Sequence, residues 1–383
     1  MRIVVAFMDA CALVGAAFCV YALWAYRGRY LPRFLEDEPE PEGPLVPLTV
    51  IVPARNEEPR VEEALRSLLT QRYPGLQVVA VDDRSTDRTG EILDRLQAEE
   101  PRLRVVHVDT LPAGWLGKPH ALHMGLREAK GEWVLLTDGD VVFAPDALGR
   151  AVGHAERVGA DHLAVFPHLE LRTVGERAVV AVFGLLFGVR QGLGGVPDPR
   201  ARGHIGIGAF NLVRRRVLEA IGGFEGLRLA VADDLELGQR IKEAGFRQTF
   251  LFSRRCVRLR WQEGVGGFVE GLTKNAFAAA GFSVPRTVLL ALGVWAANSI
   301  APLAVLSPTP WARWCAVWVW ISLGVAYAVM QHLGTASLGL VLLHPLASLV
   351  IPYVLVRSMV RALCRGGIEW RGTFYPLEWF RSG

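Results

Sequence analysis

The chain has 383 residues, of which 51% are hydrophobic, and its formal net charge is only +4 at pH 7. A chain this apolar is not an ordinary soluble protein, and the small net charge excludes a general nucleic-acid-binding surface. The five cysteines are odd in number and contain no Cys-x-x-Cys pair. We therefore expect small buried residues in a reducing compartment rather than a disulfide or zinc framework.

The first long apolar stretch runs from Ile3 to Tyr26 and is interrupted by Asp9. We expect Asp9 at the level of the lipid headgroups, with pairing inside the helical bundle as the alternative. It has no small-residue cleavage site and is followed by three arginines, Arg27, Arg29 and Arg33. Residues 1–27 are therefore interpreted as a retained transmembrane anchor. The arginines behind it outnumber Arg2 in front, which predicts that the polar middle of the chain is cytoplasmic.

Three more apolar stretches predict a C-terminal membrane region over residues 286–383: Thr287–Leu306, Cys315–Gln331 and Ala336–Val356. Three crossings from the cytoplasm would leave the C-terminus outside. The basic residues near the end favour the inside instead: Arg357, Arg361, Arg365, Arg371 and Arg381. His344, Pro345 and Pro352 interrupt the last stretch, which is either re-entrant or two short interfacial helices.

Residues 28–47 are expected to form an extended linker, because prolines and acidic residues fill positions 36–44. Strand and helix patterns alternate behind it, and residues 48–285 are interpreted as one α/β domain with a mainly parallel sheet. The expected strands are Leu48–Val52, Val78–Val81, Arg104–Val108 and Trp133–Leu136. Expected helices end near Leu69 and span Thr89–Ala98 and Lys118–Lys130.

Polar clusters follow three of these strands: Arg55-Asn56-Glu57-Glu58, Asp82 to Asp87, and Asp138-Gly139-Asp140. Ligands bind outside the carboxyl ends of the strands in such sheets. Two carboxylates one residue apart suit Mg²⁺ or Mn²⁺. Each cluster also has a structural alternative, since Asp-Gly-Asp is an ordinary turn and Asn56, Glu57, Ser85 or Asp87 can open a helix.

The motifs IVPARNEE, VDDRSTDRTG and TDGD, in this order and spacing, resemble family 2 glycosyltransferases with the Rossmann-like GT-A fold. Further motifs are similar to those of the membrane-bound members. They are the donor loop Gly114–Lys118, the acceptor-side stretch Gly206–Asn211, and Ala232-Asp233-Asp234-Leu235. The resemblance covers roughly residues 48 to 280.

The resemblance implies a role for each matching residue. Pro53, Asn56 and Asp83 would hold the uracil and ribose of a UDP-sugar, with Ala54, Glu57 and Ser85 beside them. Asp140 would bind the metal, and Asp138 would lie near the ribose or metal. Lys118 would add positive charge, and Asp234 would be the general base of an inverting transfer. Asp233 would be a helper or a helix cap, and both acids can alternatively serve only to start their helix.

Arg260 and Trp261 are similar to the end of the family's Gln-x-x-Arg-Trp motif, but Val257 stands at the Gln position. This departure weakens the alternative of a processive polysaccharide synthase. Arg254 to Arg260 can instead form a basic strip on anionic lipid headgroups. The histidines lack metal-ligand spacing and are expected to be structural, with a reservation for His204 beside the glycine-rich loop.

The resemblance is nearest to ceramide-, hopanoid- and carotenoid-type lipid glycosyltransferases. It implies a multi-pass enzyme of the cell membrane that transfers glucose from a UDP-sugar donor to a membrane lipid acceptor. The apolar segment Ala178–Val189 is too short to span. It is expected either to line the acceptor entrance or to be a buried core helix. A non-catalytic membrane scaffold is the alternative from another class, and the clustered carboxylates argue against it.

Overall fold

The computed structural model describes residues 2–26, 33–41 and 43–380. It divides the chain into two compact units, each built from several segments. The sheet unit contains Arg29–Glu170 and Gly195–Trp261, and the helical unit contains Met1–Gly28, Leu171–Gly194 and Gln262–Gly383. The region expected as one domain, 48–285, is thus interleaved, because its segments 171–194 and 262–285 belong to the helical unit.

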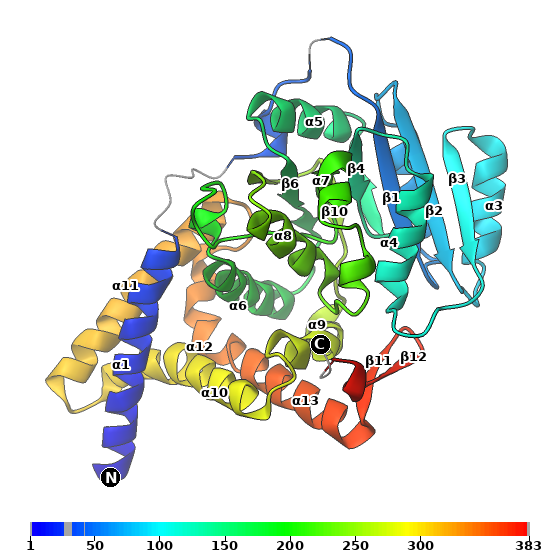
Figure 1. Cartoon of the computed structure of the whole chain (residues 1–383). Coiled ribbons are helices and arrows are strands. Elements are labelled where there is room, and N and C mark those ends of the chain that lie inside the picture. Colours follow the sequence, from blue (N-terminus) through cyan, green and yellow to red (C-terminus); the bar gives the residue numbers. More distant parts are fainter. Residues whose placement is uncertain (1, 27–32, 42, 381–383) are drawn as a thin grey trace. The chain divides into compact units, whose positions relative to one another are not determined.

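A seven-stranded sheet forms the centre of the sheet unit, in the order β3-β2-β1-β4-β8-β6-β9 (Figure 1). The β3-β2-β1-β4 and β6-β9 pairs are parallel, and only β8 runs antiparallel to its neighbours. This confirms the mainly parallel α/β fold. The strands are β1 Leu48–Ala54, β2 Leu76–Asp83, β3 Leu103–Val108, β4 Trp133–Leu136, β6 His162–Phe166, β8 Asn211–Arg214 and β9 Gln248–Phe252. A smaller sheet has the order β5-β10-β7, from β5 Val141–Phe143, β7 His168–Leu169 and β10 Val257–Leu259.

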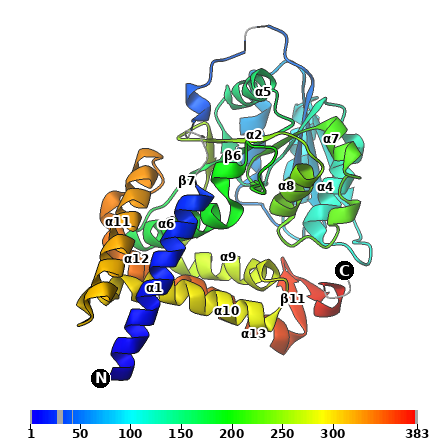
Figure 2. The same ribbon diagram turned by 60° about the vertical axis from the view of Figure 1, so that its left-hand side comes forward.

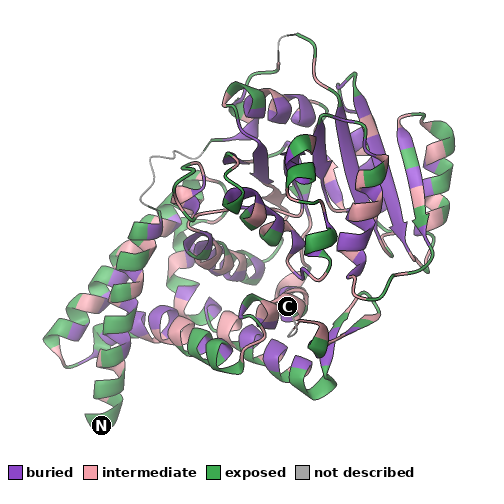
Figure 3. Cartoon of the chain, viewed as in Figure 1, coloured by how far each residue is buried: buried purple, intermediate pink, exposed green. Residues whose placement is uncertain are grey.

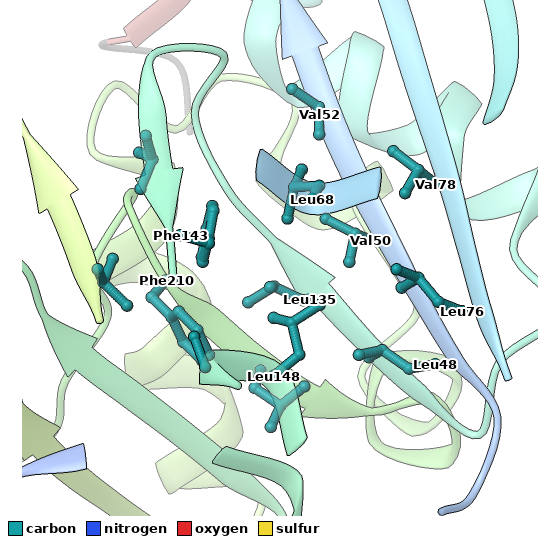
Figure 4. Packing of buried hydrophobic residues seen from close by; sticks show 14 of the residues in the cluster. Leu48, Val50, Val52, Leu68, Leu76, Val78, Leu135, Phe143, Leu148 and Phe210 are labelled. Atoms are coloured by element: carbon teal, nitrogen blue, oxygen red, sulfur yellow. The ribbon is translucent and has the colours of Figure 1, made fainter. Parts of the chain in front are cut away.

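Helices cover both faces of the large sheet. They are α2 Val61–Leu69, α3 Thr89–Glu99, α4 Gly117–Glu128, α5 Ala147–Arg157, α7 Arg215–Ala220 and α8 Asp233–Glu243, with the short η3 Glu225–Leu227. Side chains alternate across a strand, so Val50 and Val52 of β1 join the core beneath α2 and α5 (Figure 4), whereas Ile51 joins the core beneath α4 and α8. Because both faces are covered, the strands are continuous apolar runs that end in polar loops.

The prediction of an extended linker is wrong for residues 34–40, because these residues pack on the sheet unit. Leu35, in the short helix η1 Leu35–Asp37, is fully buried in the core, and Phe34 bridges to Phe252 of β9. Oε1 of Glu36 accepts hydrogen bonds from the Ser253 hydroxyl and from three consecutive backbone N–H groups, those of Arg254, Arg255 and Cys256. Composition alone does not predict this docking, because the groups that donate hydrogen bonds to Glu36 lie more than 200 residues away in sequence.

The helical unit gathers the apolar segments. Its elements are α1 Arg2–Ala25, α6 Val174–Gln191, η2 Leu193–Gly195, α9 Gly264–Ala279, α10 Val284–Val294, the π-helix η4 Trp295–Ile300, η5 Ala301–Leu306 and α11 Pro310–His332. The chain continues through η6 Leu338–Leu343, α12 His344–Ala347, α13 Val350–Arg365, β11 Gly367–Trp370, β12 Thr373–Pro376 and η7 Leu377–Phe380. Figure 2 shows α1 beside α11 and α10 beside α13.

Among the described residues, four segments are long and apolar enough to cross a membrane: Arg2–Ala25, Val284–Leu306, Pro310–His332 and Leu338–Arg365. Their outer faces carry large exposed apolar side chains such as Leu289, Trp314 and Leu342 (Figure 3). Exposed apolar surface of this extent is typical of helices that face lipid. The predicted membrane orientation used Arg27, Arg29 and Arg381. These three residues lie outside the described part of the chain.

Asp9 pairs within the helical bundle, the alternative considered for it, and its partners lie in the turn before α11. Its Oδ1 accepts a hydrogen bond from Ser307 Oγ and its Oδ2 from Thr309 Oγ1, both at 2.7 Å. The serine and threonine begin the turn into α11, and a polar turn between apolar helices needs such a partner. The carboxylate therefore ties the first span to the turn between two others.

The segment Ala178–Val189 lies within the longer helix α6. A capping box of Thr173 and Glu176 starts this helix. Leu185 of α6 is buried against Cys19, Ala301 and Val319, which come from three apolar helices. The structure therefore supports the alternative of a buried helix. The segment is buried within the helical unit rather than in the core of the sheet unit.

Candidate active site

The loops behind β1 and β2 are tied together at the carboxyl edge of the sheet. Oδ1 of Asn56 accepts from the backbone N of Thr86 at 2.8 Å, and the Asn56 backbone N donates to Ser85 Oγ at 3.1 Å. The backbone N of Glu57 donates to Thr89 Oγ1 at 2.8 Å. These residues do not open α2, which begins at Val61. Their polar groups instead hold two strand tips in one fixed arrangement.

Neither Ser85 nor Asp87 is the N-cap of α3, which is Arg88, but the Asp87 side chain supports the start of this helix. Its Oδ1 accepts from the Thr89 backbone N at 3.0 Å, at the first residue of α3. Its Oδ2 accepts from the backbone N of Glu58 at 3.2 Å. The side chain of Ser85 is directed to Asn56 instead, which leaves Ser85 within the loop cluster.

Asp83, at the end of β2, is buried and held by two arginines. Nε and Nη2 of Arg84 lie 2.8 and 3.0 Å from its two carboxylate oxygens, and Nη1 of Arg55 lies at 3.7 Å. Arg84 adopts a positive φ of 56° and Asn56 one of 53°, a strained conformation for Arg that is common at functional sites. A methyl group at Gly117 would come within 2.4 Å of Asp83, so the first turn of α4 needs a glycine there.

The acids of the Asp-x-Asp motif follow β4 and have different basic neighbours. Oδ1 of Asp138 lies 2.7 Å from Nζ of Lys118, whereas Oδ2 of Asp140 lies 3.5 Å from Nη1 of Arg60. Lys118 also lies 3.5 Å from Oδ2 of Asp233. One ammonium group therefore joins the tip of β4 to the start of α8.

Asp233 and Asp234 occupy the first turn of α8, but neither is its N-cap, which is Ala232. Oδ2 of Asp234 accepts from the Gly208 backbone N at 2.7 Å, and Oδ1 accepts from the Leu235 backbone N at 2.9 Å. The side chain of Asp234 is thus aimed at the glycine-rich segment. Asp233 is buried, and its carboxylate faces Lys118 instead.

The glycine-rich segment lies against α8 so closely that no side chain fits between them. A methyl group at Gly206 would meet the carbonyl oxygen of Asp234 at 1.7 Å, and one at Gly238 would meet that of Ile205 at 1.8 Å. Backbone atoms cannot move away as a flexible side chain can. These two glycines therefore set the distance at which Gly208 can donate to Asp234.

The cluster has a clear electrostatic pattern. Burial raises the pKa of Asp233 to about 7; Lys118 opposes this shift, and the neighbouring Asp234 and Asp138 add to it. Burial also raises the pKa of Asp234, again against the effect of Lys118. For Lys118, burial opposes the charge, but Asp138, Asp233 and Asp234 outweigh it and raise its pKa. Three carboxylates that share one ammonium form a site that favours additional positive charge.

Some residues expected at the site have other partners. The guanidinium of Arg260 donates to the Glu170 carbonyl oxygen, and Trp261 packs against the core of the sheet unit. In the basic strip, Arg254 pairs with Asp37 at 3.2 Å and Arg258 with Glu170 at 3.3 Å. These two arginines are therefore compensated locally by acids.

One histidine differs from the expectation. Nδ1 of His120 is buried without a hydrogen-bond partner in the described part of the chain, so this ring is not a satisfied structural histidine. Nδ1 of His204 lies 3.3 Å from the Arg202 carbonyl oxygen.

The structure thus brings most of the expected residues to one edge of the sheet. A small pocket is lined by Lys118, Thr137, Asn211, Asp233 and Asp234 together with Gly208 and three leucines, Leu122, Leu136 and Leu237. The loop cluster of Asn56, Asp83 and Ser85 connects to it through α4, where Gly117 faces Asp83 and Lys118 faces Asp138. Pro53 and Ala54 complete β1 beside them. Sequence patterns missed Arg60 and the Gly208 backbone N–H, since neither has a residue signature.

Among the described residues, no group of three or more His, Cys, Asp or Glu side chains is arranged to hold a metal ion. The donor set present is the Asp138–Asp140 pair of hard oxygen ligands. Mg²⁺ and Mn²⁺ characteristically combine one or two such carboxylates with oxygens of a phosphate substrate. The residues therefore fit a divalent ion bound together with a nucleotide diphosphate.

Comparison with known proteins decides the family. Residues 49–222 match the model of Glycosyl transferase family 2. Residues 49–222 therefore form a family 2 glycosyltransferase domain. This glycosyltransferase is similar to 4,4'-diaponeurosporenoate glycosyltransferase of Staphylococcus aureus strain USA300, with 26% identity over 338 residues, 86% of this chain and 88% of the relative. The protein of that name from strain bovine RF122/ET3-1 is 25% identical over 341 residues, with the same coverage.

A solved structure confirms the GT-A-like fold of the glycosyltransferase. The mannosyltransferase PcManGT from Pyrobaculum calidifontis, in complex with GDP-Man and Mn²⁺, matches with a TM-score of 0.55 and 23% identity. The match covers 93% of this chain and 99% of that one. The similarity therefore extends through the sheet unit and into the helical unit.

Proposed function

We propose that this glycosyltransferase moves a sugar, glucose in the first instance, from UDP to a hydroxyl or carboxyl group of a membrane lipid, with inversion. The observation that carries the proposal is the position of Lys118 between Asp138 and the Asp233–Asp234 pair. It joins the residues expected to hold the donor to the residue expected to activate the acceptor.

The nucleotide would lie over the tied loops of β1 and β2. Asn56 and Asp83 are held rigidly there by hydrogen bonds and arginines, so little side-chain freedom remains to be lost when a nucleotide binds. Lys118 and Arg60 would face the diphosphate, because each already lies beside an acid of the Asp-x-Asp motif.

Asp138 and Asp140 would hold Mg²⁺ or Mn²⁺ against the diphosphate. Such an ion acts as a Lewis acid that stabilises the charge of the departing nucleotide. PcManGT was solved with Mn²⁺ and GDP-Man, which supports a metal and leaves the identity of the nucleotide to experiment. The UDP assignment rests on the resemblance of the motifs.

Asp234 would accept the proton of the acceptor. Burial raises the pKa of this carboxyl, which makes it a stronger base than an exposed aspartate once it is ionised. The Gly208 and Leu235 backbone N–H groups fix its orientation. Transfer in a single displacement needs one such base and no second nucleophilic carboxylate, so the configuration of the sugar would invert.

A similar protein and the apolar helices of this chain both support a lipid acceptor. The relative at 26% identity is named for a carotenoid-type acid, 4,4'-diaponeurosporenoate, and four helices of this chain are apolar enough to span a membrane. We infer that the acceptor is a lipid of the same leaflet that the sheet unit faces, and that this face is cytoplasmic, where UDP-sugars are found.

The test is transfer from labelled UDP-glucose, and in parallel from labelled GDP-mannose, to a total lipid extract of the host by the purified full-length protein. A labelled lipid formed from UDP-glucose, and lost in Asp234→Asn, is expected. A labelled polymer would support a processive synthase instead, and transfer from GDP-mannose alone would overturn the donor assignment. No transfer to any acceptor, with UDP and Mn²⁺ binding absent as well, would favour a scaffold.

A further inference from the structure

The side of the membrane on which several helices lie follows from chain connectivity alone. Both ends of α6 connect to the sheet unit, at 170–171 and at 194–195, and α9 begins three residues after Trp261. Neither helix is among the four apolar segments, and α9 is only 16 residues long, about 24 Å against a hydrocarbon thickness of about 30 Å. The ends of both helices therefore lie on the side of the membrane where the chain connects to the sheet unit, called here the near side.

The C-terminal segment is fastened to α9. Arg357 and Arg361 of α13 both pair with Glu270, and Ser358 Oγ accepts from the Phe277 backbone N at 2.9 Å. Lys274 lies over the ring of Trp370 at 4.3 Å, and the rings of Phe282 and Phe380 stack at 4.7 Å. These contacts extend from residue 357 to residue 380. Residues 357–380 are therefore on the near side.

The far side is marked by the contact of Asp9 with Ser307 and Thr309. The chain reaches this turn from the near side through Val284–Leu306, and α11 then returns. Met330, near the end of α11, lies 3.7 Å from where a Gly184 methyl group would stand on α6, and Tyr26 lies against Gly188 of the same helix. Residues 26 and 330 are thus both near-side residues.

The remaining apolar segment begins just after α11 ends and finishes at α9, so both of its ends are on the near side. We propose that Leu338–Arg365 does not cross the bilayer but enters and leaves it on the near side, so that the described part of the chain crosses three times. Its partner is the near leaflet. The α13 face that carries Tyr353, Val356, Val360 and Leu363 is exposed and apolar, and Arg357 and Arg361 of the same helix pair with Glu270 of α9.

A buried polar network holds the re-entrant segment in place. Tyr327 Oη lies 3.1 Å from Nδ1 of His344, whose Nε2 lies 3.2 Å from Oδ1 of Asn298. Ser299 and Ser348 share a hydrogen bond of 2.8 Å. The π-helix η4 and the interrupted helix at η6–α12 meet at this network. Irregular backbone at membrane depth is stable only where protein groups satisfy it, and an uninterrupted span would have no use for such a pairing.

Cysteine labelling of the full-length protein tests the proposal. Cys364 is native and exposed, and the other four cysteines are replaced by alanine. Ser337→Cys adds a site before the re-entrant segment, and Pro308→Cys adds one in the far-side turn; both positions are exposed. Sealed vesicles of each orientation are treated with a membrane-impermeant maleimide, and variants are first checked for unchanged melting temperature.

Cys364 and Ser337→Cys are expected to react from the same face, and Pro308→Cys from the opposite one. The pair 308 and 337 brackets α11 and serves as the internal control for a crossing segment. Reaction of positions 337 and 364 from opposite faces would overturn the proposal. Protease digestion of an epitope tag fused to the C-terminus gives a second reading, and protection of the tag where the sheet unit is accessible would also overturn it. Neither result depends on the sugar or acceptor.

Discussion

Nζ of Lys118 lies 2.7 Å from Oδ1 of Asp138, and the same nitrogen lies 3.5 Å from Oδ2 of Asp233. The first acid follows a strand in the N-terminal half of the domain, and the second starts a helix 95 positions later in the numbering. A single side chain on α4 thus compensates negative charge from two separate parts of the sheet unit.

Lys118→Met is expected to weaken binding of UDP with Mn²⁺ about tenfold and to lower the free energy of unfolding by about 1–3 kcal/mol, because charged groups would lose a hydrogen-bonded partner. Calorimetry and thermal melting measure the two effects. Lys130→Met, at an exposed position of the same region, is the control and should change neither. Unchanged nucleotide affinity would remove Lys118 from the donor site.

Asp140→Ala is expected to abolish metal-dependent binding of UDP, since it removes a hard oxygen ligand that water replaces poorly. Calorimetric titration of UDP with and without Mn²⁺ measures this. Asp109→Ala removes another carboxylate, exposed and just after β3, and should leave binding intact. The metal assignment fails if Asp140→Ala binds UDP as the wild type does.

Asp234→Asn is expected to retain nucleotide binding but to reduce transfer by at least about 10²-fold, because the amide keeps the shape and loses the basicity. Initial rates at saturating donor measure the loss. Asp233→Asn should reduce transfer less, since its carboxylate faces Lys118 rather than the glycine-rich segment. The reverse order of the two variants would show that Asp233 is the base.

Gly206→Ala and Gly238→Ala are each expected to destabilise the protein by about 1–3 kcal/mol or more, because the added methyl group meets a backbone carbonyl at less than 2 Å. Differential scanning calorimetry measures the shift. Gly266→Ala is the matched control, since nothing lies within 4 Å of the added atom there. Equal melting temperatures for all three variants would contradict the close packing on α8.

Glu36→Gln is expected to lower the melting temperature at pH 7, with a difference that shrinks as the pH falls. Although burial acts the other way, hydrogen bonds from Cys256, Arg255 and Ser253 lower the pKa of Glu36. A carboxyl with a lowered folded pKa stabilises above its unfolded pKa, about 4.3, and this stability is lost as pH falls through the folded value. Melting curves from pH 7 to pH 3 test the trend, with the exposed Glu91→Gln as control. A pH-independent difference would show that the charge is unimportant.

The sequence predicted the parallel part of the fold well, because β1 to β4 are local apolar runs whose ends carry distinctive polar motifs. It could not predict that 171–194 leaves the sheet unit, since α6 has the same apolar composition as a core helix. The docking of Glu36 was missed, and the pairing of Asp9 was only one of two alternatives, for the same physical reason. Each depends on hydrogen-bond partners more than 200 residues away, and neither position shows a periodic pattern.

At the candidate site, motif recognition found the carboxylates and Lys118 but not their grouping. Arg60 has no motif of its own, yet its guanidinium lies 3.5 Å from Asp140 and donates to the Arg260 carbonyl oxygen at 3.0 Å. The role of the Gly208 backbone N–H cannot be predicted from side-chain motifs, because every residue except proline has this group. Such contributions depend on tertiary proximity alone.

The chain passes between the two units at four places, 28–29, 170–171, 194–195 and 261–262. A soluble fragment of this enzyme therefore cannot be made by trimming the two termini, because removal of α1 and everything after Trp261 still leaves α6 threaded through the middle of the remaining sequence. A protease that nicks any one of these connections would likewise release nothing from the membrane. Excision of the sheet unit requires replacement of 171–194 by a short polar loop, and that engineered junction is the place to begin if a detergent-free preparation is wanted.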